Sequence, residues 1–292
     1  MKKLFILSSF LLISSQLFSQ KTSELKSQIE HLISSKKVTI GVSILDLESG
    51  DTLSINGNKL FPMLSVFKFH IALTVLDKVD KGELNLSDKL FINKTELLAD
   101  TWSPFRDKHP DGNISITIQE ALQYTVSQSD NNLCDVLLRR IGGVKVVESF
   151  INNPNFIIHN DEKAMHQSWN AQLVNTTTPN YSVALLKKFY EKKILTAKSR
   201  EFLYNAMVAT SVAQNRIKGK LPLGAEVAHR PGTSGTNSDG LTAAINDIGI
   251  VKLPNSKHFI LAIFLQNTTE TFKESEEIIA DISKLTWDFY SK

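Results

Sequence analysis

Apolar and polar residues alternate near both ends of the chain, and this pattern predicts β-strands. The segment 38–56 alternates on both sides of Ser49-Gly50-Asp51, which supplies turn residues, so we expect a β-hairpin there. Near the carboxyl end, three further stretches have strand character. These are residues 226–232, 241–254 and 258–267.

Between these strands the apolar residues recur at helical spacing. Residues 65–82 form one such stretch, and Gly82 is a typical stop for the helix. Residues 85–210 are predicted to be mostly helical. Within them, Thr117-Ile-Gln-Glu120 has the pattern of a capping box, and Asp130 could start a helix that ends at Gly142-Gly143.

Helices are also predicted at both ends of the mature chain. Residues 22–34 are helix-like, and residues 271–290 form a closing helix with a possible capping box at Thr271 and Glu274. Strands at both ends with helices between them indicate an α/β (α+β) fold, in which an antiparallel sheet is flanked by helices and joined to an all-helical domain. We expect 21–64 and 211–292 to form the α/β domain and 65–210 the all-helical one.

The first twenty residues have the pattern of a secretion signal. Lys2 and Lys3 are followed by the apolar run Leu4–Ile13 and then by a small, polar stretch. The run is too short to span a bilayer, so we favour a cleaved signal peptide (1–20) over the alternatives, a core helix or an anchor. We therefore expect export to the periplasm, without stable membrane association.

Composition narrows the classes of function. Removing the two lysines of the signal leaves 31 basic and 30 acidic residues, so charge gives no case for nucleic-acid binding. Cys134 is the only cysteine, which excludes a disulfide within the chain. The seven histidines include no His-x-x-x-His pair. We expect no metal and no cofactor, and we expect a monomer.

Ser65-Val-Phe-Lys68 places a hydroxyl and an amine one helical turn apart. Serine is a weak nucleophile until a base takes its proton, and an unprotonated lysine can be that base. The pattern alone is weak, because Ser-x-x-Lys also begins at Ser23 and Ser34. The alternative for Ser65 is a plain helix cap.

Two more motifs carry possible chemistry. Ser129-Asp130-Asn131 could be a loop and helix cap, or Ser129 could pass a proton while Asn131 holds a substrate. Arg230-Pro231-Gly232 lies in a predicted strand, where proline would cost a hydrogen bond unless it occupies an edge position.

Together, Ser65–Lys68, Ser129–Asn131 and Arg230–Gly232 resemble the Ser-x-x-Lys, Ser-Asp-Asn and Lys-Thr-Gly motifs of class A serine β-lactamases and penicillin-binding proteins. The resemblance covers nearly the whole mature chain and is strongest to the extended-spectrum branch of class A. It implies that Ser65 is acylated, that Lys68 or Glu162 accepts its proton, and that Ser129 protonates the leaving nitrogen.

The resemblance also implies that Glu162 activates the water that removes the acyl group. The alternative interpretation of Glu162 is that it is a solvated loop carboxylate beside Asp161. Most class A enzymes have an asparagine four residues later, where this chain has His166. We interpret this as a reshaped loop, in which an imidazole would replace the amide beside the water and make its hydrogen bond in a different geometry.

Arg230 would keep the positive charge that binds the substrate carboxylate, while Pro231 loses the hydroxyl expected to bond it. The backbone N–H groups of Ser65 and Thr233 would form the oxyanion hole, and the Thr233 hydroxyl could partly replace the lost one. Gly232 keeps the backbone close to the substrate.

Two residues complete the expected substrate site. Arg216 stands where some class A enzymes have a second arginine under this pocket. The alternative interpretation is that Arg216 is a surface arginine. Trp102 matches an aromatic at the rim, with a merely half-buried tryptophan as the alternative.

We therefore expect a β-lactamase that hydrolyses penicillins and cephalosporins. The alternatives are a penicillin-binding-protein-like acylase or D,D-peptidase, and a non-catalytic module with a decayed pocket.

Overall fold

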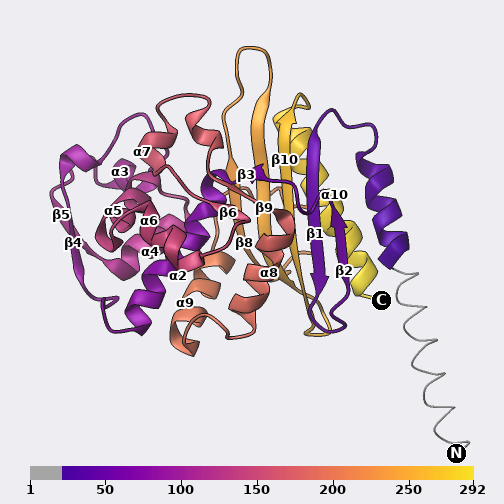
Figure 1. Cartoon of the computed structure of the whole chain (residues 1–292), viewed down its shortest axis with the longest axis horizontal. Helices are drawn as coiled ribbons and strands as arrows, with labels where there is room; N and C mark the ends of the chain where they lie inside the picture. Colours follow the sequence, from indigo (N-terminus) through magenta and orange to yellow (C-terminus); the bar gives the residue numbers. More distant parts are fainter. Residues whose placement is uncertain (1–21) are drawn as a thin grey trace, which may run out of the picture.

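The computed structural model describes residues 22–292, and the predicted signal peptide lies outside this range (Figure 1). Among the described residues, no helix is both long and apolar enough to cross a membrane.

A five-stranded antiparallel sheet forms the centre of the fold, with the strand order β2-β1-β10-β9-β8 (Figure 1). The predicted hairpin and the three predicted carboxyl-terminal strands are confirmed in it. Its strands are β1 (Thr39–Asp46), β2 (Thr52–Ile55), β8 (Val227–Thr233), β9 (Thr242–Lys252) and β10 (His258–Thr268).

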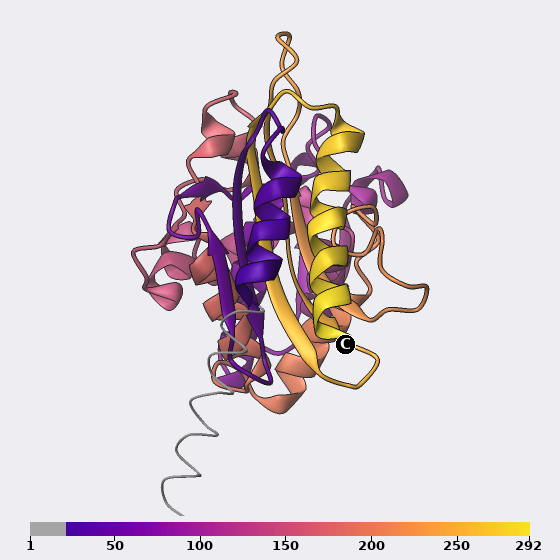
Figure 2. The same cartoon turned by 90° about the vertical axis from the view of Figure 1, so that its right-hand side faces the viewer.

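Two helices cover one face of the sheet, the helix at residues 22–33 and α10 (Phe272–Tyr290), which lie side by side in Figure 2. Both were predicted, and α10 begins with the expected capping box of Thr271 and Glu274. Leu25 and Ile279 are fully buried in the apolar cluster between these helices and the sheet. The two ends of the described chain are thereby packed on the same face.

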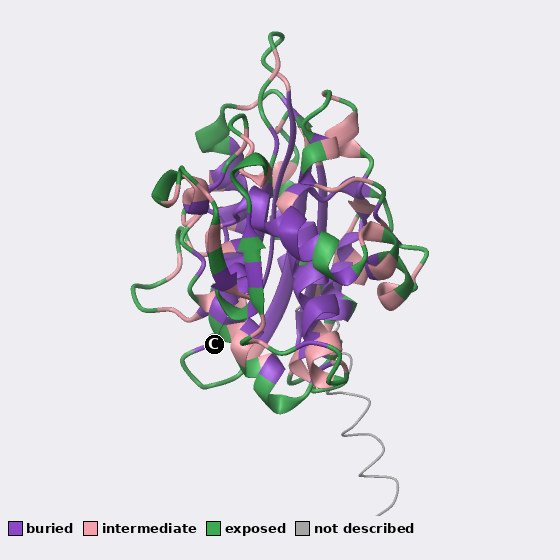
Figure 3. Ribbon diagram, turned by 90° about the vertical axis from the view of Figure 1, so that its left-hand side faces the viewer, coloured by how far each residue is buried: buried purple, intermediate pink, exposed green. Residues whose placement is uncertain are grey.

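The other face of the sheet packs against the remaining helices. The central one is α2 (Phe67–Asp80), which follows the short 3-10 turn η1 (Leu64–Val66) and is buried over most of its length. Figure 3 shows that buried residues occupy the middle of the molecule and exposed residues its outer loops. A second apolar cluster runs from these helices to the sheet and includes Phe69 and Phe264. The other helices are α3 (Pro104–Lys108), α4 (Ile118–Ser127), α5 (Asn131–Ile141), α6 (Val144–Ile151), α7 (Glu162–Met165), α8 (Pro179–Tyr190) and α9 (Ala197–Val208).

The predicted helix boundaries in this region are confirmed at three positions. The side chain of Thr117 caps α4 in a capping box with Glu120, and Asp130 caps α5. Gly142 ends α5 with a φ of 102°, a conformation that glycine adopts without steric cost.

Short strands also occur within the region predicted to be helical and, in the case of β3, just before it; the hydrophobic pattern did not reveal them. They are too short to show a period of two residues. They pair as β3-β7-β6 and β4-β5. Their bounds are β3 (Phe61–Pro62), β4 (Lys89–Ile92), β5 (Ile114–Thr117), β6 (Phe156–Ile157) and β7 (Thr176–Thr177). The division into two domains stays a prediction.

His70 is a fully buried polar residue on α2. Its ring stacks on Phe156 with the centroids 4.4 Å apart. Burial lowers the pKa of His70 from 6.5 to about 3, against the opposing effect of the Val66 and Phe67 carbonyls. The folded protein therefore holds this imidazole neutral at pH values where the unfolded chain would protonate it.

We expect His70 to destabilise the fold in acid. The contribution of His70 to the free energy of unfolding is constant above pH 6.5. It is lost as the pH falls from 6.5 toward 3, because in this range only the unfolded chain binds the proton. Between pH 8 and pH 5 the loss is about 2 kcal/mol. Urea unfolding at both pH values should show that His70→Leu removes this difference, whereas the exposed control His31→Gln should keep it. An unchanged pH dependence in His70→Leu would contradict the assignment.

Candidate active site

The predicted pair Ser65 and Lys68 meets at the start of α2. Ser65 lies in the 3-10 turn η1 and Lys68 one turn later, so that Nζ of Lys68 is 2.9 Å from Oγ of Ser65. The residue before the serine, Leu64, has a φ of 47°, a conformation that non-glycine residues adopt at a cost. The serine hydroxyl is thereby presented at a strained turn beside the amine.

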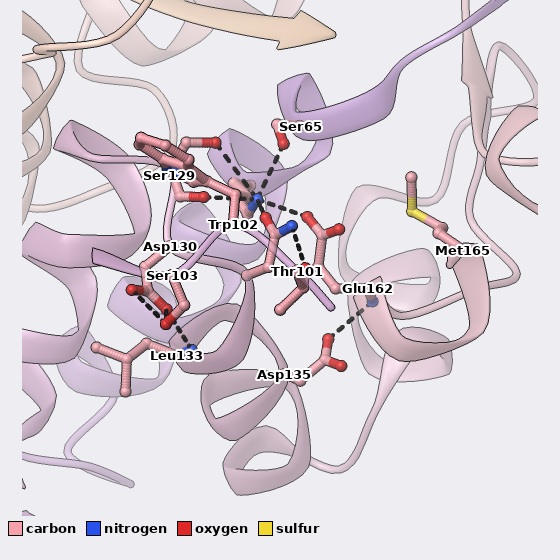
Figure 4. A network of polar contacts seen from close by, with 12 residues as sticks. Ser65, Thr101, Trp102, Ser103, Ser129, Asp130, Leu133, Asp135, Glu162 and Met165 are labelled. Carbon is pink, nitrogen blue, oxygen red and sulfur yellow. Dashed lines mark hydrogen bonds and ion pairs between the residues drawn. The ribbon is translucent and has the colours of Figure 1, made fainter. Parts of the chain in front are cut away.

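Lys68 is the centre of a polar network. Figure 4 shows the side chains of Ser65, Ser129 and Glu162 directed toward one common point in this network. The side chain of Lys68 is fully buried, and Nζ lies 2.5 Å from Oδ1 of Asn131 and 2.5 Å from Oε1 of Glu162. Nζ is also 3.2 Å from the carbonyl of Ser129 and 3.4 Å from its hydroxyl. A buried cation needs such a set of acceptors, and here the predicted motifs supply all of them.

The second motif enters this network from the start of α5. Ser129 has a φ of 61°, and Asn131 is the first residue of the helix. Asp130, the cap between them, accepts hydrogen bonds from the backbone N–H groups of Leu133 and Phe105 and from the hydroxyl of Ser103. Burial raises the pKa of Asp130, against these three donors. The predicted helix cap is therefore confirmed at Asp130, while its two neighbours, Ser129 and Asn131, face Lys68. The functional roles of these two residues stay predictions.

Glu162 is buried at the start of α7, and the sequence analysis missed the residue that holds it there. The carboxylate of Asp135, on α5, accepts the backbone N–H groups of Glu162 at 2.8 Å and of Lys163 at 2.9 Å. Burial, together with the charges of Asp161 and Glu162, raises the pKa of Asp135 to about 7. Its position four residues after Asn131, on the same face of α5, is a signal that could have identified it.

His166 is engaged through both ring nitrogens. Nδ1 lies 2.7 Å from the carbonyl oxygen of Glu162, and Nε2 lies 3.2 Å from the hydroxyl of Thr101. Thr101 in turn accepts a hydrogen bond from the amide of Asn131 at 2.7 Å. The histidine therefore links α7 to the segment before α3, which supports the interpretation of a reshaped loop.

The hydrogen bonds between β8 and β9 alternate along β8. The N–H of Ser234 donates to the carbonyl of Ala244 at 2.9 Å, directly after the end of the strand. The N–H of Lys252 donates to the carbonyl of Glu226 at 3.1 Å, directly before it. In an antiparallel pair every second residue faces the partner, so the even-numbered residues of β8 bond β9. The odd-numbered ones face away, toward the free edge of the sheet.

Pro231 and Thr233 are both odd-numbered residues of this edge strand. Proline has no backbone N–H, but at position 231 an N–H would point away from β9. Pro231 therefore costs the sheet no hydrogen bond between β8 and β9. His229 is another odd-numbered residue of β8. Its carbonyl accepts a hydrogen bond from the hydroxyl of Thr210, so this backbone group also points away from β9. The N–H of Thr233 therefore also faces away from β9, and Thr233 lines the same cavity as Ser65. Its role as an oxyanion donor stays a prediction.

Arg230 has a different position from the one expected of a direct carboxylate ligand. It is fully buried, and its guanidinium donates to the carbonyls of Ser65 and Val126 and to the hydroxyl of Ser129. Burial lowers its pKa to about 10, so it stays charged at neutral pH. Arg230 lies behind the cavity wall, where it joins the edge strand to the nucleophile turn and to Ser129.

Arg216 contacts Thr233, a residue of the predicted carboxylate site. Only 1% of it is exposed, so the alternative of a surface arginine is wrong. Its guanidinium donates to the hydroxyl of Thr233 at 2.7 Å and to Oε1 of Glu276 at 3.1 Å. It also donates to the carbonyls of Gly232 and Asn246. Burial lowers the pKa of Arg216, whereas the carboxylates of Asp247 and Glu276 raise it.

A cavity of about 740 Å³ is lined by most of the predicted site residues. Trp102 stands at its rim, 56% exposed, with its indole N–H donating to the carbonyl of Gln128. The predicted residues that line the cavity are Ser65, Trp102, Ser129, Asn131, Glu162, His166, Arg216 and Thr233. A nucleophile, a carboxylate, a proton donor and outward backbone N–H groups thus share one solvent-accessible space, with Lys68 directly behind it.

Comparison with known proteins agrees with this geometry. Residues 24–290 match the family model described as the β-lactamase enzyme family. The chain is 42% identical to β-lactamase VEB-1 of Pseudomonas aeruginosa, over 92% of this chain and 91% of that protein. It is 36% identical to the extended-spectrum β-lactamase PER-1 of the same organism, over 98% and 94%. The solved structure of the TLA-3 extended-spectrum β-lactamase superposes with a TM-score of 0.91 at 45% identity, covering 93% of this chain and all of that one.

We expect Asp135 to hold the loop that carries Glu162. Asp135→Asn keeps one acceptor oxygen but turns an amide donor toward the second N–H, so the loop should loosen. Hydrogen exchange at pH 8 should then be roughly 10- to 100-fold faster at the amides of Glu162 and Lys163. Asp107→Asn, an exposed control, should leave both amides unchanged. Unaltered exchange in Asp135→Asn would show that other contacts fix the loop.

Proposed function

Because the chain belongs to the class A serine β-lactamases, which open the lactam amide through a serine acyl-enzyme, we propose that Ser65, Lys68, Ser129 and Glu162 carry this reaction here. The observation that carries the proposal is that the side chains of Ser65, Ser129 and Glu162 converge on Lys68 Nζ and line a single cavity. The resemblance to the extended-spectrum branch is confirmed by relatives that bear that name.

Acylation begins when Ser65 loses its proton. The contact of 2.5 Å between Lys68 and Glu162 lets the lysine pass a proton to the carboxylate, and the resulting neutral amine then accepts the proton of the Ser65 hydroxyl. The serine oxygen attacks the lactam carbonyl. The negative charge that develops on the carbonyl oxygen is stabilised by the N–H groups of Ser65 and Thr233.

Breaking the lactam C–N bond requires a proton on the departing nitrogen, which Ser129 supplies. Its hydroxyl oxygen accepts a hydrogen bond from Arg230, which leaves the hydroxyl proton free to point into the cavity. Lys68, 3.4 Å away, can return a proton to Ser129 afterwards. We therefore assign Arg230 to the orientation of Ser129, in place of the direct carboxylate contact expected from the sequence.

Deacylation is assigned to Glu162. Its carboxylate reaches the cavity from the side opposite Ser129 and lies beside the serine–lysine pair. Glu162 first returns to the neutral Lys68 the proton that it took during acylation. As a general base it then takes a proton from water, which attacks the ester, and Ser65 leaves with a proton from Lys68, which Glu162 replaces. His166 shapes this wall of the cavity through its contacts with Glu162 and Thr101.

The carboxylate of the substrate is assigned to Thr233 and Arg216. Because the Thr233 hydroxyl accepts its hydrogen bond from Arg216, its own proton is available to the carboxylate. Arg216 adds a positive charge directly below. We propose penicillins and cephalosporins as substrates, including bulky oxyimino-cephalosporins on the evidence of the extended-spectrum names of PER-1 and TLA-3. We further propose a periplasmic monomer released from a cleaved signal peptide at residues 1–20.

Glu162→Gln should separate the two halves of the reaction. Acylation of Ser65 should slow because Lys68 loses its proton acceptor, but deacylation should slow more because the amide cannot deprotonate water. A penicillin adduct should therefore accumulate, and turnover should fall by roughly 100-fold or more. Intact-protein mass spectrometry after mixing with benzylpenicillin measures the adduct. Glu148→Gln, an exposed control, should turn over normally. Undiminished hydrolysis in Glu162→Gln would refute the role of this residue, and an unmodified protein that accumulates adduct without turnover would indicate an acylase.

Pro231→Thr should restore a hydroxyl beside Thr233. Since position 231 faces the free edge of the sheet, the new residue gains no bond to β9, and stability should change by less than about 1 kcal/mol. The KM for carboxylate-bearing substrates should fall several-fold because the added hydroxyl is a second donor to the carboxylate. Steady-state kinetics with a penicillin would measure this. An unaltered KM would show that Thr233 and Arg216 already satisfy the carboxylate.

A further inference from the structure

An exposed aromatic side chain borders the cavity at the first residue of α10. Phe272 is 46% exposed, although the apolar contacts that hold α10 to the sheet come from other residues, such as Ile278 and Ile282. The capping box of Thr271 and Glu274 fixes the backbone on both sides of it. Phe272 is therefore held in place by its helix while its ring stays open to the cavity.

The ring lies against the cation that supports the carboxylate site. The centre of the Phe272 ring is 5.8 Å from Cζ of Arg216, within the range of a cation–π contact. Arg216 in turn donates to the hydroxyl of Thr233. The aromatic face is thus immediately next to the place where the substrate carboxylate would be held, and the aliphatic side chains of Val212 and Ala213 line the same cavity.

The covalent structure of the substrate determines what reaches this face. In a cephalosporin, the ring carbon that carries the carboxylate is double-bonded to C3, so the C3 substituent extends from the atom adjacent to the carboxylate-bearing carbon. The acyl side chain on C7 leaves from the other end of the fused rings. When the carboxylate binds Thr233 and Arg216, the C3 substituent lies beside the carboxylate and the C7 side chain lies on the far side of the lactam.

Resting on the carboxylate assignment made above, we propose that Phe272 is a specificity-determining residue that packs against the C3 substituent of cephalosporins and favours aromatic or heteroaromatic groups there. Such a ring stacks on Phe272 or meets it edge to face, which desolvates both surfaces. A C3 methyl group does not reach far enough to cover the ring. Phe272 therefore contributes to the binding of one part of one substrate class and takes no part in the chemistry at Ser65.

The test compares two cephalosporins that share a thienylacetyl side chain at C7. One carries a methyl group at C3 and the other a neutral N-methyltetrazolylthiomethyl group. Phe272→Ala should lower kcat/KM for the heteroaromatic substrate by about 3- to 10-fold, mainly through KM, and change the value for the methyl substrate by less than about 2-fold. Phe272→Tyr keeps a ring and should retain the unmodified protein's ratio between the two substrates.

Phe91 provides the matched control. It is another exposed phenylalanine, 55% exposed, and it lies on β4, away from the cavity. Phe91→Ala should leave both substrates unaffected. An equal loss on both substrates in Phe272→Ala, or no loss on either, would overturn the proposal while the unmodified enzyme still hydrolyses both. Absence of hydrolysis by the unmodified protein would contradict the proposed function itself.

Discussion

The buried charge of Lys68 is the interaction on which the site depends. An ammonium group removed from water costs several kcal/mol unless acceptors surround it, and removing a partner leaves that cost uncompensated. Its acceptors come from three places along the chain, the turn at Ser65, the start of α5 and Glu162 on α7. One charge thereby fixes the relative positions of three segments, and these are the segments to which we assign the nucleophile, the proton donor and the hydrolytic base.

The edge strand β8 adds a second constraint. Only its even-numbered residues bond β9, so its outward positions are free to serve the cavity. This explains why a proline is tolerated in the motif and why the N–H of Thr233 is available. The two arginines of the site occupy different positions. Arg230 joins the strand to Ser65 and Ser129 behind the wall, and Arg216 reaches Thr233 from below.

Much of this was predictable from the sequence because its signals are local. Thr117 and Asp130 cap helices through bonds three residues away, and the Ser65–Lys68 spacing implies the contact that the structure contains. The rest depends on contacts distant in sequence. No pattern around Arg230 reveals that its guanidinium turns inward to Val126, and Asp135 gains its role only when α7 folds onto α5. The short strands β6 and β7 likewise exist only as partners of each other and of β3.

The central claim is that Ser65, which is hydrogen-bonded to the buried Lys68, forms the covalent intermediate. Rapid-quench mass spectrometry of the unmodified protein mixed with benzylpenicillin, followed by peptide mapping, tests this most directly. The account predicts a transient mass increase of one intact penicillin, confined to the peptide that contains Ser65 and absent from Ser65→Ala. A transient adduct on a different residue, or hydrolysis that persists in Ser65→Ala, would contradict it.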